Sequence, residues 1–330
     1  MTQWMDRPVL VTGADGFIGS HLVERLAAQG ARVRAFCFYN SNASRGWLDE
    51  TTEPTAVADV RLGDIRDARF VENCCSGVDT VFHLAALISI PYSYAAPESF
   101  VDTNIRGTLN ILEAARRAGC RRVIHTSTSE VYGTPDTLPI RETHPLQGQS
   151  PYSASKIAAD KLCEAYHCSF GLPVVVVRPF NTYGPRQSMR AVLPTLLVQL
   201  LSGRCEVVLG RLDPRRDLTF VSDTVEGMLA AGEAEGVEGE VIQLGTGRAE
   251  SIGDLFQTAC RVLGRKASVV QEAGRLRPDA SEVMVLLSDP AKAQKLLGWS
   301  SRVPLEEGIL RTARWLEPRL DRYRSALYHV

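Results

Sequence analysis

The sequence lacks any apolar run long enough to cross a membrane. A membrane-spanning helix needs about 20 consecutive apolar residues, and the apolar stretches of this chain are much shorter. The segment from Met1 to Arg7 also lacks the basic start and the apolar core of a secretory signal peptide. We therefore expect a cytoplasmic protein that does not bind membranes.

An excess of charge of either sign is missing as well. The chain has 37 Lys and Arg residues against 38 Asp and Glu residues, which gives a formal net charge of −1. General binding to nucleic acids or to anionic lipids depends on a large positive excess, so the composition argues against both kinds of partner. A balanced net charge does not exclude specific basic pockets. We expect no nucleic-acid partner.

Cysteine pairs with metal-binding spacing are absent. The 8 cysteines are scattered along the chain, no Cys-x-x-Cys pair occurs, and only Cys74 and Cys75 are adjacent. Such a distribution favours reduced structural thiols over a disulfide framework or a metal centre. The sequence therefore predicts no metal site.

Low-complexity linkers and internal repeats are also absent, which indicates one compact protein. Short apolar segments alternate with helical patterns, as is typical of a parallel sheet covered by helices on both faces. We expect an α/β protein with a Rossmann-like doubly wound sheet over residues 1–181, with returns near 216–247, and a small α/β substrate lobe over most of 182–330. The strand candidates are Pro8 to Thr12, Arg32 to Phe38, Val57 to Leu62, Thr80 to Leu84, Arg122 to Thr126 and Pro173 to Arg178, and helices are expected at Ser251 to Leu263 and Leu305 to Leu316.

A glycine-rich turn follows the first of these strands. Gly13, Gly16 and Gly19 are spaced as Gly-x-x-Gly-x-x-Gly and lead, through Phe17 and Ile18, into an amphipathic helix. Glycines permit a tight turn and let backbone amides approach a pyrophosphate at the amino end of the helix, where the helix dipole favours negative charge. Glycine turns also occur for structural reasons alone, but the order strand, turn and helix favours a dinucleotide site.

A second pattern, from Tyr152 to Lys156, places a phenol and an ammonium one helical turn apart. A nearby cation favours a phenolate, so Lys156 is expected to lower the pKa of Tyr152 from its usual value of about 10. Such a tyrosine is able to take the proton of an alcohol. The alternative is a pair on a helix surface, and the neighbouring motifs argue for the functional interpretation.

Taken together, these motifs resemble those of extended short-chain dehydrogenases/reductases, in particular nucleotide-sugar epimerases and dehydratases. The resemblance covers essentially the whole chain and implies an enzyme that binds NAD(P) and a nucleotide-diphosphate sugar. Further matching stretches are Gly63 to Asp67, His83 to Ala86, Asn104 to Thr108, Arg178 to Pro185 and Arg216 to Asp223.

The resemblance also implies further cofactor contacts. Asp64 and Ile65 match a pair that contacts the adenine, and the segment Leu84, Ala85 and Ala86 matches one that runs beneath the cofactor.

The end of the second strand is expected to receive the adenosine ribose, where an acid favours NAD over NADP. Residues 35–42 contain no acid: Cys37 stands near the expected position, with Asn40 and Arg45 close by. We take Asn40 and Arg45 as cofactor-binding candidates. Because this acid is missing, we expect NADP slightly more than NAD as the cofactor.

Glu130 distinguishes this chain from the usual pattern of the family's 4-epimerases, which carry a small or neutral residue there. A carboxylate at this position suggests chemistry at the sugar's C5. The resemblance implies that Tyr152 takes the 4-hydroxyl proton, that Thr128 bonds the 4-oxygen and that Lys156 holds the ribose and tunes Tyr152. Glu130 then removes the C5 proton, water leaves from C6, and the hydride returns to C6. The expected reaction is a 4,6-dehydration with a tightly bound, recycled cofactor.

Ser129 departs from the dTDP-glucose dehydratases, which carry an acidic Asp in its place. A serine hydroxyl is too weak an acid to protonate the leaving group alone, so Glu130 shuttles the proton or Ser129 relays it. GDP-mannose dehydratases and UDP-glucuronate decarboxylases both share the Thr-Ser-Glu arrangement. A decarboxylase, a 4-epimerase and, more remotely, a non-catalytic dinucleotide-binding regulator therefore stay as alternatives.

The rest of the chain favours dehydration of an N-acetylglucosamine nucleotide. Stretches within 38–49, 184–195 and 275–278 resemble dehydratases of nonulosonic (legionaminic) acid pathways. Carried over by position, Asn181, Arg216 and Arg277 are expected to hold the diphosphate, for which guanidinium groups are well suited. The sequence leaves the nucleotide open.

A homodimer is expected from the family resemblance. Relatives pair two helices from each subunit, here a helix that begins near Pro97 and the helix that carries Tyr152. Apolar residues at helical spacing support this, although some of them must pack on the sheet. They are Ile105, Leu109 and Leu112 in the first helix and Ala158, Leu162 and Ala165 in the second.

Overall fold

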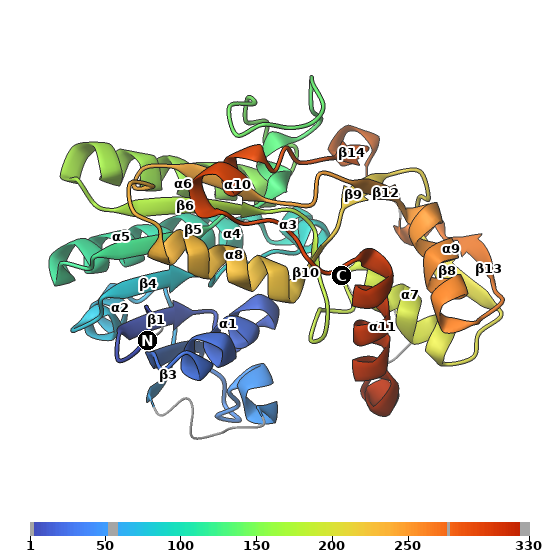
Figure 1. Ribbon diagram of the computed structural model, residues 1–330, viewed down its shortest axis with the longest axis horizontal. Helices are drawn as coiled ribbons and strands as arrows, with labels where there is room; N and C mark the ends of the chain where they lie inside the picture. Colours follow the sequence, from blue (N-terminus) through green and yellow to red (C-terminus); the bar gives the residue numbers. More distant parts are fainter. Residues whose placement is uncertain (1–2, 52–58, 276–277, 324–330) are drawn as a thin grey trace.

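The computed structural model describes residues 3–51, 59–275 and 278–323 (Figure 1). Its centre is a sheet of seven strands in the order β11-β6-β5-β4-β1-β2-β3, and each neighbouring pair is parallel. The chain runs from β1 outward to β3 and then returns to β4 on the other side of β1, which is the doubly wound order of a Rossmann fold. The expected fold class is therefore confirmed. The strands are β1 (Pro8–Thr12), β2 (Arg32–Phe38), β3 (Asp59–Gly63), β4 (Thr80–His83), β5 (Arg122–Thr126), β6 (Val174–Pro179) and β11 (Val241–Leu244).

The expected strands agree with the observed ones to within one or two residues where the structure describes them. Val57, the expected start of the third strand, lies outside the described residues, and β3 begins at Asp59. β11 joins the sheet beside β6 after the chain has left it, in the region near 216–247 where a return was expected.

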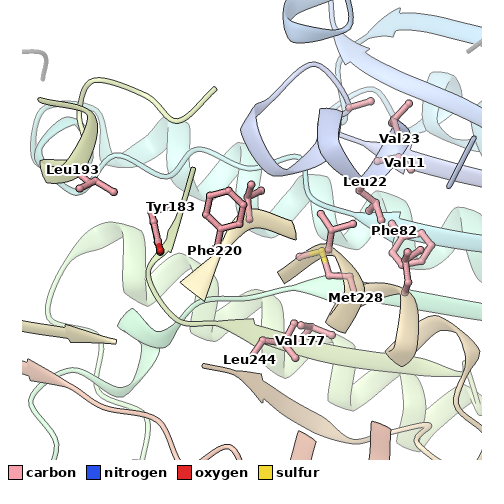
Figure 2. Packing of buried hydrophobic residues seen from close by; sticks show 14 of the residues in the cluster. Val11, Leu22, Val23, Phe82, Val177, Tyr183, Leu193, Phe220, Met228 and Leu244 are labelled. Atoms are coloured by element: carbon pink, nitrogen blue, oxygen red, sulfur yellow. The ribbon is translucent and has the colours of Figure 1, made fainter. Parts of the chain in front are cut away.

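Two apolar cores cover the two faces of the sheet, because successive side chains of a strand point in opposite directions. In β1, Val9 and Val11 belong to one core and Leu10 to the other. Figure 2 shows part of the first core, where the labelled Leu22 lies near Val11 and Met228 lies near Phe82 and Val177. The first core is closed by α1 (Phe17–Ala28) and α8 (Val221–Glu233), and the second by α2 (Ala68–Cys75), α5 (Gly107–Ala118) and α6 (Pro151–Phe170).

The expected helix near Pro97 is present, with an irregular first part. After α3 (Ile90–Ala95), the helix α4 (Pro97–Phe100) continues through a π-helical turn (Val101–Arg106) into α5. Asn104 in this turn is buried, and its amide bonds both the N–H and the C=O of Leu87 at 2.8 and 2.9 Å. It also donates to the hydroxyl of Ser155 at 2.9 Å. Asn104 therefore ties the segment after β4 to α6.

Most of the remaining elements gather beside the carboxyl ends of the strands in a smaller lobe, and Figure 1 shows α7, α9, β8, β13 and α11 together at that end of the molecule. The helices expected at Ser251 to Leu263 and Leu305 to Leu316 are present as α9 and α11, with Ser251 as the cap of α9. The lobe contains β7 (Thr182–Tyr183) with β10 (Thr219–Phe220), β8 (Glu206–Leu209) with β13 (Ser268–Gln271), β9 (Arg215–Asp217) between β12 (Ala249–Ser251) and β14 (Val285–Leu286), and the helices α7 (Val192–Leu201), α9 (Ile252–Leu263) and α11 (Leu305–Leu316). The helix α10 (Ala291–Leu297) packs instead against β11 and α8 of the larger part.

Short 3-10 helices complete the described structure. They are Gly46–Glu50, Ser129–Tyr132, Ala273–Arg275, Asp279–Ser281 and Glu317–Arg322. In the described part of the chain, no helix has the length and apolar character that crossing a membrane requires. All 8 cysteines lie in that part and are unpaired.

Candidate active site

The turn between β1 and α1 brings backbone atoms closer together than side chains would permit. Gly13 has a φ of +66°, and a Cβ added to Gly19 would lie 2.0 Å from the Gly13 carbonyl oxygen. Gly16 caps α1 and has no side chain to bond the amides of the first turn, which starts with Phe17 and Ile18. Uncapped amides at a helix start suit a phosphate group. These residues fit the pyrophosphate of a dinucleotide.

The segment after β4 lies directly against this turn. Thr12, the last residue of β1, accepts hydrogen bonds from the N–H groups of Leu84 and Ala85, both at 3.1 Å, and its hydroxyl lies 2.8 Å from Nδ1 of His83. A Cβ on Gly13 would lie 2.9 Å from the Ala85 nitrogen. The structure therefore brings together the glycine turn and the segment that continues to Ala86, as the sequence predicts.

The ends of β2 and β3 complete the expected cofactor side of the sheet. Asp64 follows β3, and its carboxylate pairs with Arg66 at 2.6 Å. Ile65 is buried and its carbonyl accepts from the Asn110 amide at 2.9 Å. Because β3 lies beside β2 in the sheet, Asp64 and Ile65 reach the same edge as the residues that follow β2.

Asn40 and Arg45 have local structural partners after β2. The Asn40 side chain bonds both the N–H and the C=O of Ser44, at 3.0 and 2.8 Å, which closes this loop. Arg45 pairs with Asp49, with Nε donating at 2.8 Å. The sequence reasoning missed Asp15, whose Oδ2 accepts from the Phe38 N–H at 3.3 Å. The sequence could have indicated Asp15 because it lies inside the glycine turn, directly after the strand β1 that pairs with β2.

The helix α6 positions the tyrosine and the lysine. It begins at a capping box in which Ser150 accepts from the Ser153 N–H at 3.1 Å, with Pro151 in the first turn. Tyr152 and Lys156 are 7% and 3% exposed. Lys156 donates from Nζ to the Thr126 carbonyl at 2.7 Å, at the end of β5. The capping box therefore fixes where α6 begins, and with this start the side chains of Tyr152 and Lys156 lie on its buried face.

The pKa of Tyr152 is raised, whereas the sequence predicted that Lys156 would lower it. Burial is the main cause of the raised pKa; the hydrogen bond with Thr128 lowers it, and the charges of Glu130 and Asp160 raise it. The Lys156 ammonium is directed to the Thr126 carbonyl. Removing a phenol from water disfavours its charged form, and here this effect wins.

Thr128 and Glu130 stand in the short helix that follows β5. Thr128 caps this helix and accepts from the Glu130 N–H at 3.2 Å, while its hydroxyl also reaches the Tyr152 phenol. Ser129 is buried and Glu130 is half-buried. Among residues 3–51, 59–275 and 278–323, no hydrogen bond or ion pair engages the Glu130 carboxylate. The structure thus brings Thr128, Glu130 and Tyr152 together, and within its described part the Glu130 carboxylate has no hydrogen-bond or ion-pair partner.

A buried polar cluster lies behind this group, and sequence reasoning missed it. Asp160, one turn beyond Lys156, accepts from the Ser127 hydroxyl and from Arg178 Nη2, both at 2.8 Å. Burial raises the pKa of Asp160, but the interaction with His125 and the charge of Arg178 outweigh burial and lower it. Burial also lowers the pKa of Lys156, and Asp160 opposes that shift. The spacing of residues 152, 156 and 160 along one helix face was the available signal.

Of the three residues expected to bind the substrate, the structure describes two, Asn181 and Arg216. Arg216 in β9 pairs with Glu282 at 3.0 Å, and Asn181 follows β6. In the described residues, Oδ1 of Asn181 is buried without a hydrogen-bond partner. Arg277 lies outside the described residues. Asn181 is joined to the lobe because its carbonyl accepts from the Thr219 N–H at 3.1 Å.

The fold and these residues define a class of protein: a Rossmann-fold dinucleotide-binding protein with a Tyr-Lys pair and a group of polar residues at the carboxyl ends of its strands. Comparison with known proteins narrows the class. Residues 10–312 match the family model described as GDP-mannose 4,6 dehydratase.

Individual relatives agree with that match. The chain is 36% identical to a dTDP-glucose 4,6-dehydratase of Actinoplanes sp., over 93% of this chain and 97% of that protein. It is 33% identical to a UDP-glucose 4-epimerase of Mycolicibacterium smegmatis, over 93% and 97%. A crystal structure of the dTDP-glucose 4,6-dehydratase DesIV of Streptomyces venezuelae, with NAD and TYD bound, superposes with a TM-score of 0.84 at 30% identity, over 96% of this chain and 98% of that one.

The chain belongs to the extended short-chain dehydrogenase/reductase family of nucleotide-sugar dehydratases and epimerases. It is an enzyme of this family, and the family resemblance expected from the sequence is confirmed.

Proposed function

We propose that the protein is a nucleotide-sugar 4,6-dehydratase that makes a 4-keto-6-deoxy sugar from a nucleotide-linked hexose, with N-acetylglucosamine as the sugar. The observation that carries the proposal is the half-buried Glu130 carboxylate beside Thr128 and Tyr152, without a hydrogen bond or ion pair among the described residues. A hydride transfer out and back needs no such group, whereas removal of a C5 proton does.

Tyr152 and Thr128 act at the sugar's C4. The Thr128 hydroxyl bonds the phenol, and both reach the 4-oxygen, so that Tyr152 takes the hydroxyl proton as the ketone forms. The nicotinamide, when bound, supplies the acceptor and later the donor of the hydride, and its positive charge favours the phenolate that burial disfavours. Lys156, fixed by Thr126, holds the ribose.

Glu130 acts at C5 and C6. The 4-ketone acidifies the C5 hydrogen, and the carboxylate removes it as general base. The resulting carboxylic acid then protonates the C6 hydroxyl as it leaves, because Ser129 is too weak an acid to do so alone. One carboxyl group serves as base and then as acid in each turnover. Return of the hydride to C6 leaves an enolate, which takes a proton from water at C5 and so completes the 4-keto-6-deoxy sugar.

Asn181, Arg216 and Arg277 bind the diphosphate in this proposal. Arg216 is already turned toward an anion, the Glu282 carboxylate, and phosphate oxygens present the same kind of acceptor to its guanidinium. The choice of N-acetylglucosamine rests on the resemblance of the stretches within 38–49, 184–195 and 275–278 to dehydratases of that substrate.

We further propose a cytoplasmic homodimer. The helices α5 and α6 pack side by side. Leu109 and Ala165 are exposed, Ile105, Ala158 and Leu162 are half-buried, and Leu112 packs in the sheet's second core. Five of the six expected apolar residues therefore keep surface that a second copy is able to cover.

Mass spectrometry of the product tests the reaction. The protein is incubated with UDP- and GDP-N-acetylglucosamine, dTDP-glucose, GDP-mannose or UDP-glucuronate and NAD or NADP. The proposal expects loss of one water from an N-acetylglucosamine nucleotide. Loss of carbon dioxide from UDP-glucuronate, or an epimerised product of unchanged mass, overturns it.

Glu130→Gln separates the steps. The variant is expected to oxidise C4, which absorbance at 340 nm reports, without releasing water, because only the base at C5 is missing. Tyr152→Phe is expected to show neither signal. The control Glu164→Gln, which removes an exposed carboxylate from α6, should behave as the wild type. Water loss by Glu130→Gln at the wild-type rate contradicts the assigned role.

A further inference from the structure

The end of β2 has no acidic side chain of its own. Cys37 is fully buried and the next two side chains, Phe38 and Tyr39, are 61% and 64% exposed. In Rossmann proteins an acid here bonds the ribose 2′-hydroxyl of NAD and repels the 2′-phosphate of NADP. On the sequence alone, its absence favoured NADP.

Asp15 brings a carboxylate to this place from the neighbouring turn. Because β1 and β2 are adjacent and parallel, the turn after β1 lies beside the end of β2. Asp15 Oδ2 accepts from the Phe38 N–H at 3.3 Å, and the preceding residue, Ala14, donates from its N–H to Phe36 at 3.2 Å. Burial, followed by the charge of Asp15, raises the pKa of Cys37 to about 12. The negative charge therefore reaches the position where the strand itself offers only a thiol.

The loop after β2 encloses Asp15 on its other side. The Asp15 carbonyl accepts from the Trp47 N–H at 3.1 Å. Gly46 has a φ of +57°, and a Cβ there would lie 2.8 Å from the Asp15 Cβ. The carboxylate is thus held between the strand end and this loop rather than free in solvent.

Arg45, the nearest candidate for a phosphate clamp, is engaged with an acid of its own loop. Asp49 accepts from Arg45 Nε at 2.8 Å and from its backbone N–H at 2.9 Å, and from the Ser44 hydroxyl at 2.9 Å. The positive charge of Arg45 is therefore balanced locally. Among the residues that the structure describes, no cation forms a hydrogen bond with the Asp15 carboxylate.

We propose that Asp15 takes the role of the missing β2 acid and makes this protein select NAD over NADP. Its carboxylate receives the 2′-hydroxyl of the adenosine ribose and repels a 2′-phosphate, because two like charges would then share a partly buried site. The inference rests on the cofactor site of the proposed function and not on the identity of the sugar or of the product.

Equilibrium binding tests this assignment apart from catalysis. Bound nucleotide is first extracted from the purified protein and identified. The dissociation constants of NAD, NADP, ADP-ribose and 2′-phospho-ADP-ribose are then measured calorimetrically for the wild type, Asp15→Asn and Asp49→Asn. The control is Glu235→Gln, an exposed acid next to Ala234, which lies near the start of β5 at the opposite edge of the sheet.

The wild type is expected to carry NAD and to bind ADP-ribose more tightly than its 2′-phosphorylated form. Asp15→Asn should lower this preference at least about tenfold, through tighter binding of the phosphorylated ligand, while the control keeps it. Asp49→Asn, which frees Arg45, should also improve NADP binding while Asp15 keeps some preference for NAD.

A wild type that prefers the phosphorylated ligand, or an unchanged ratio in Asp15→Asn, overturns the proposal. Circular dichroism establishes that each variant is folded. A product other than the dehydrated sugar would contradict the proposed function and leave this binding result intact.

Discussion

Arg216 and Glu282 form an ion pair in which Nη2 lies 3.0 Å from Oε1 and each side chain is only 9% exposed. The two residues come from β9 and from the segment before β14, so the pair joins two segments of the smaller lobe that are far apart in the sequence. If Arg216 binds the diphosphate, the anionic substrate and Glu282 share one guanidinium.

Glu282→Gln should therefore lower stability and strengthen the response to UDP. Loss of one partner of a buried pair is expected to reduce the free energy of unfolding by roughly 1 to 3 kcal/mol. UDP should then raise the unfolding temperature more in the variant than in the wild type, as differential scanning fluorimetry measures. The control Glu307→Gln breaks an exposed pair with Arg311 and should cost less than about 0.5 kcal/mol. An equal shift with UDP in variant and wild type contradicts this view of Arg216.

Thr128→Val should slow catalysis and move to higher pH the limb of the pH profile on which activity rises. The Thr128 hydrogen bond lowers the pKa of Tyr152, whose burial raises it. Without that bond the pKa rises further, so the active phenolate forms at higher pH and kcat at neutral pH falls by roughly ten- to a hundredfold. Thr258→Val, on the outer face of α9 beside Arg261, is the matched control. A fall in kcat without any change in the pH profile would mean that Thr128 affects catalysis only through packing and not through the pKa of Tyr152.

His125 should make the protein less stable in mild acid. Burial, with the charge of Lys156, lowers the pKa of His125 from its usual 6.5 to about 4. Between these values the unfolded chain binds a proton that the folded protein does not, so stability falls as the pH falls through that window. From pH 7.5 to 5 the loss from this one group is about 2 kcal/mol.

Urea unfolding at the two pH values measures this effect. In His125→Leu the corresponding part of the pH dependence should disappear, although His83, whose pKa burial also lowers, still contributes. The same pH dependence in the variant and in the wild type would assign the acid sensitivity to other groups.

Leu109→Glu should weaken the proposed dimer. Leu109 is 36% exposed on α5, where a charge would be buried in an interface but solvated in a monomer. Light scattering during gel filtration should show a lower average mass at micromolar concentration, with a normal circular dichroism spectrum. Val270→Glu changes an equally apolar, 42% exposed residue of β13 and should keep the wild-type mass. A wild-type protein with the mass of a monomer in the same measurement contradicts the proposed dimer.

The glycine turn and the Tyr-Lys pair could be predicted because their chemistry lies in short spacings. Gly13 to Gly19 occupy one turn, and Tyr152 and Lys156 are neighbours on one helix whose start Ser150 and Pro151 define. The strands followed from runs of apolar residues buried on both faces of a parallel sheet.

The partners of these residues could not be predicted in the same way. The sequence predicted a lowered pKa for Tyr152 from its distance to Lys156 along the helix, but burial decides the direction, and burial depends on the whole fold. Asp160 could be placed near Lys156 by spacing, yet Arg178, its ion-pair partner, comes from a different strand.

The sequence by itself determined the doubly wound class and the glycine turn, and it predicted the members of the proposed catalytic set, because local spacing and hydrophobic pattern carry those features. Only the tertiary structure decided which charges meet. It placed the Asp15 side chain beside the end of β2 and paired Arg216 with Glu282. Among the described residues, it left the Glu130 carboxylate without a hydrogen-bond or ion-pair partner. Electrostatic interactions depend on distance in space and on burial, and neither can be read along a chain.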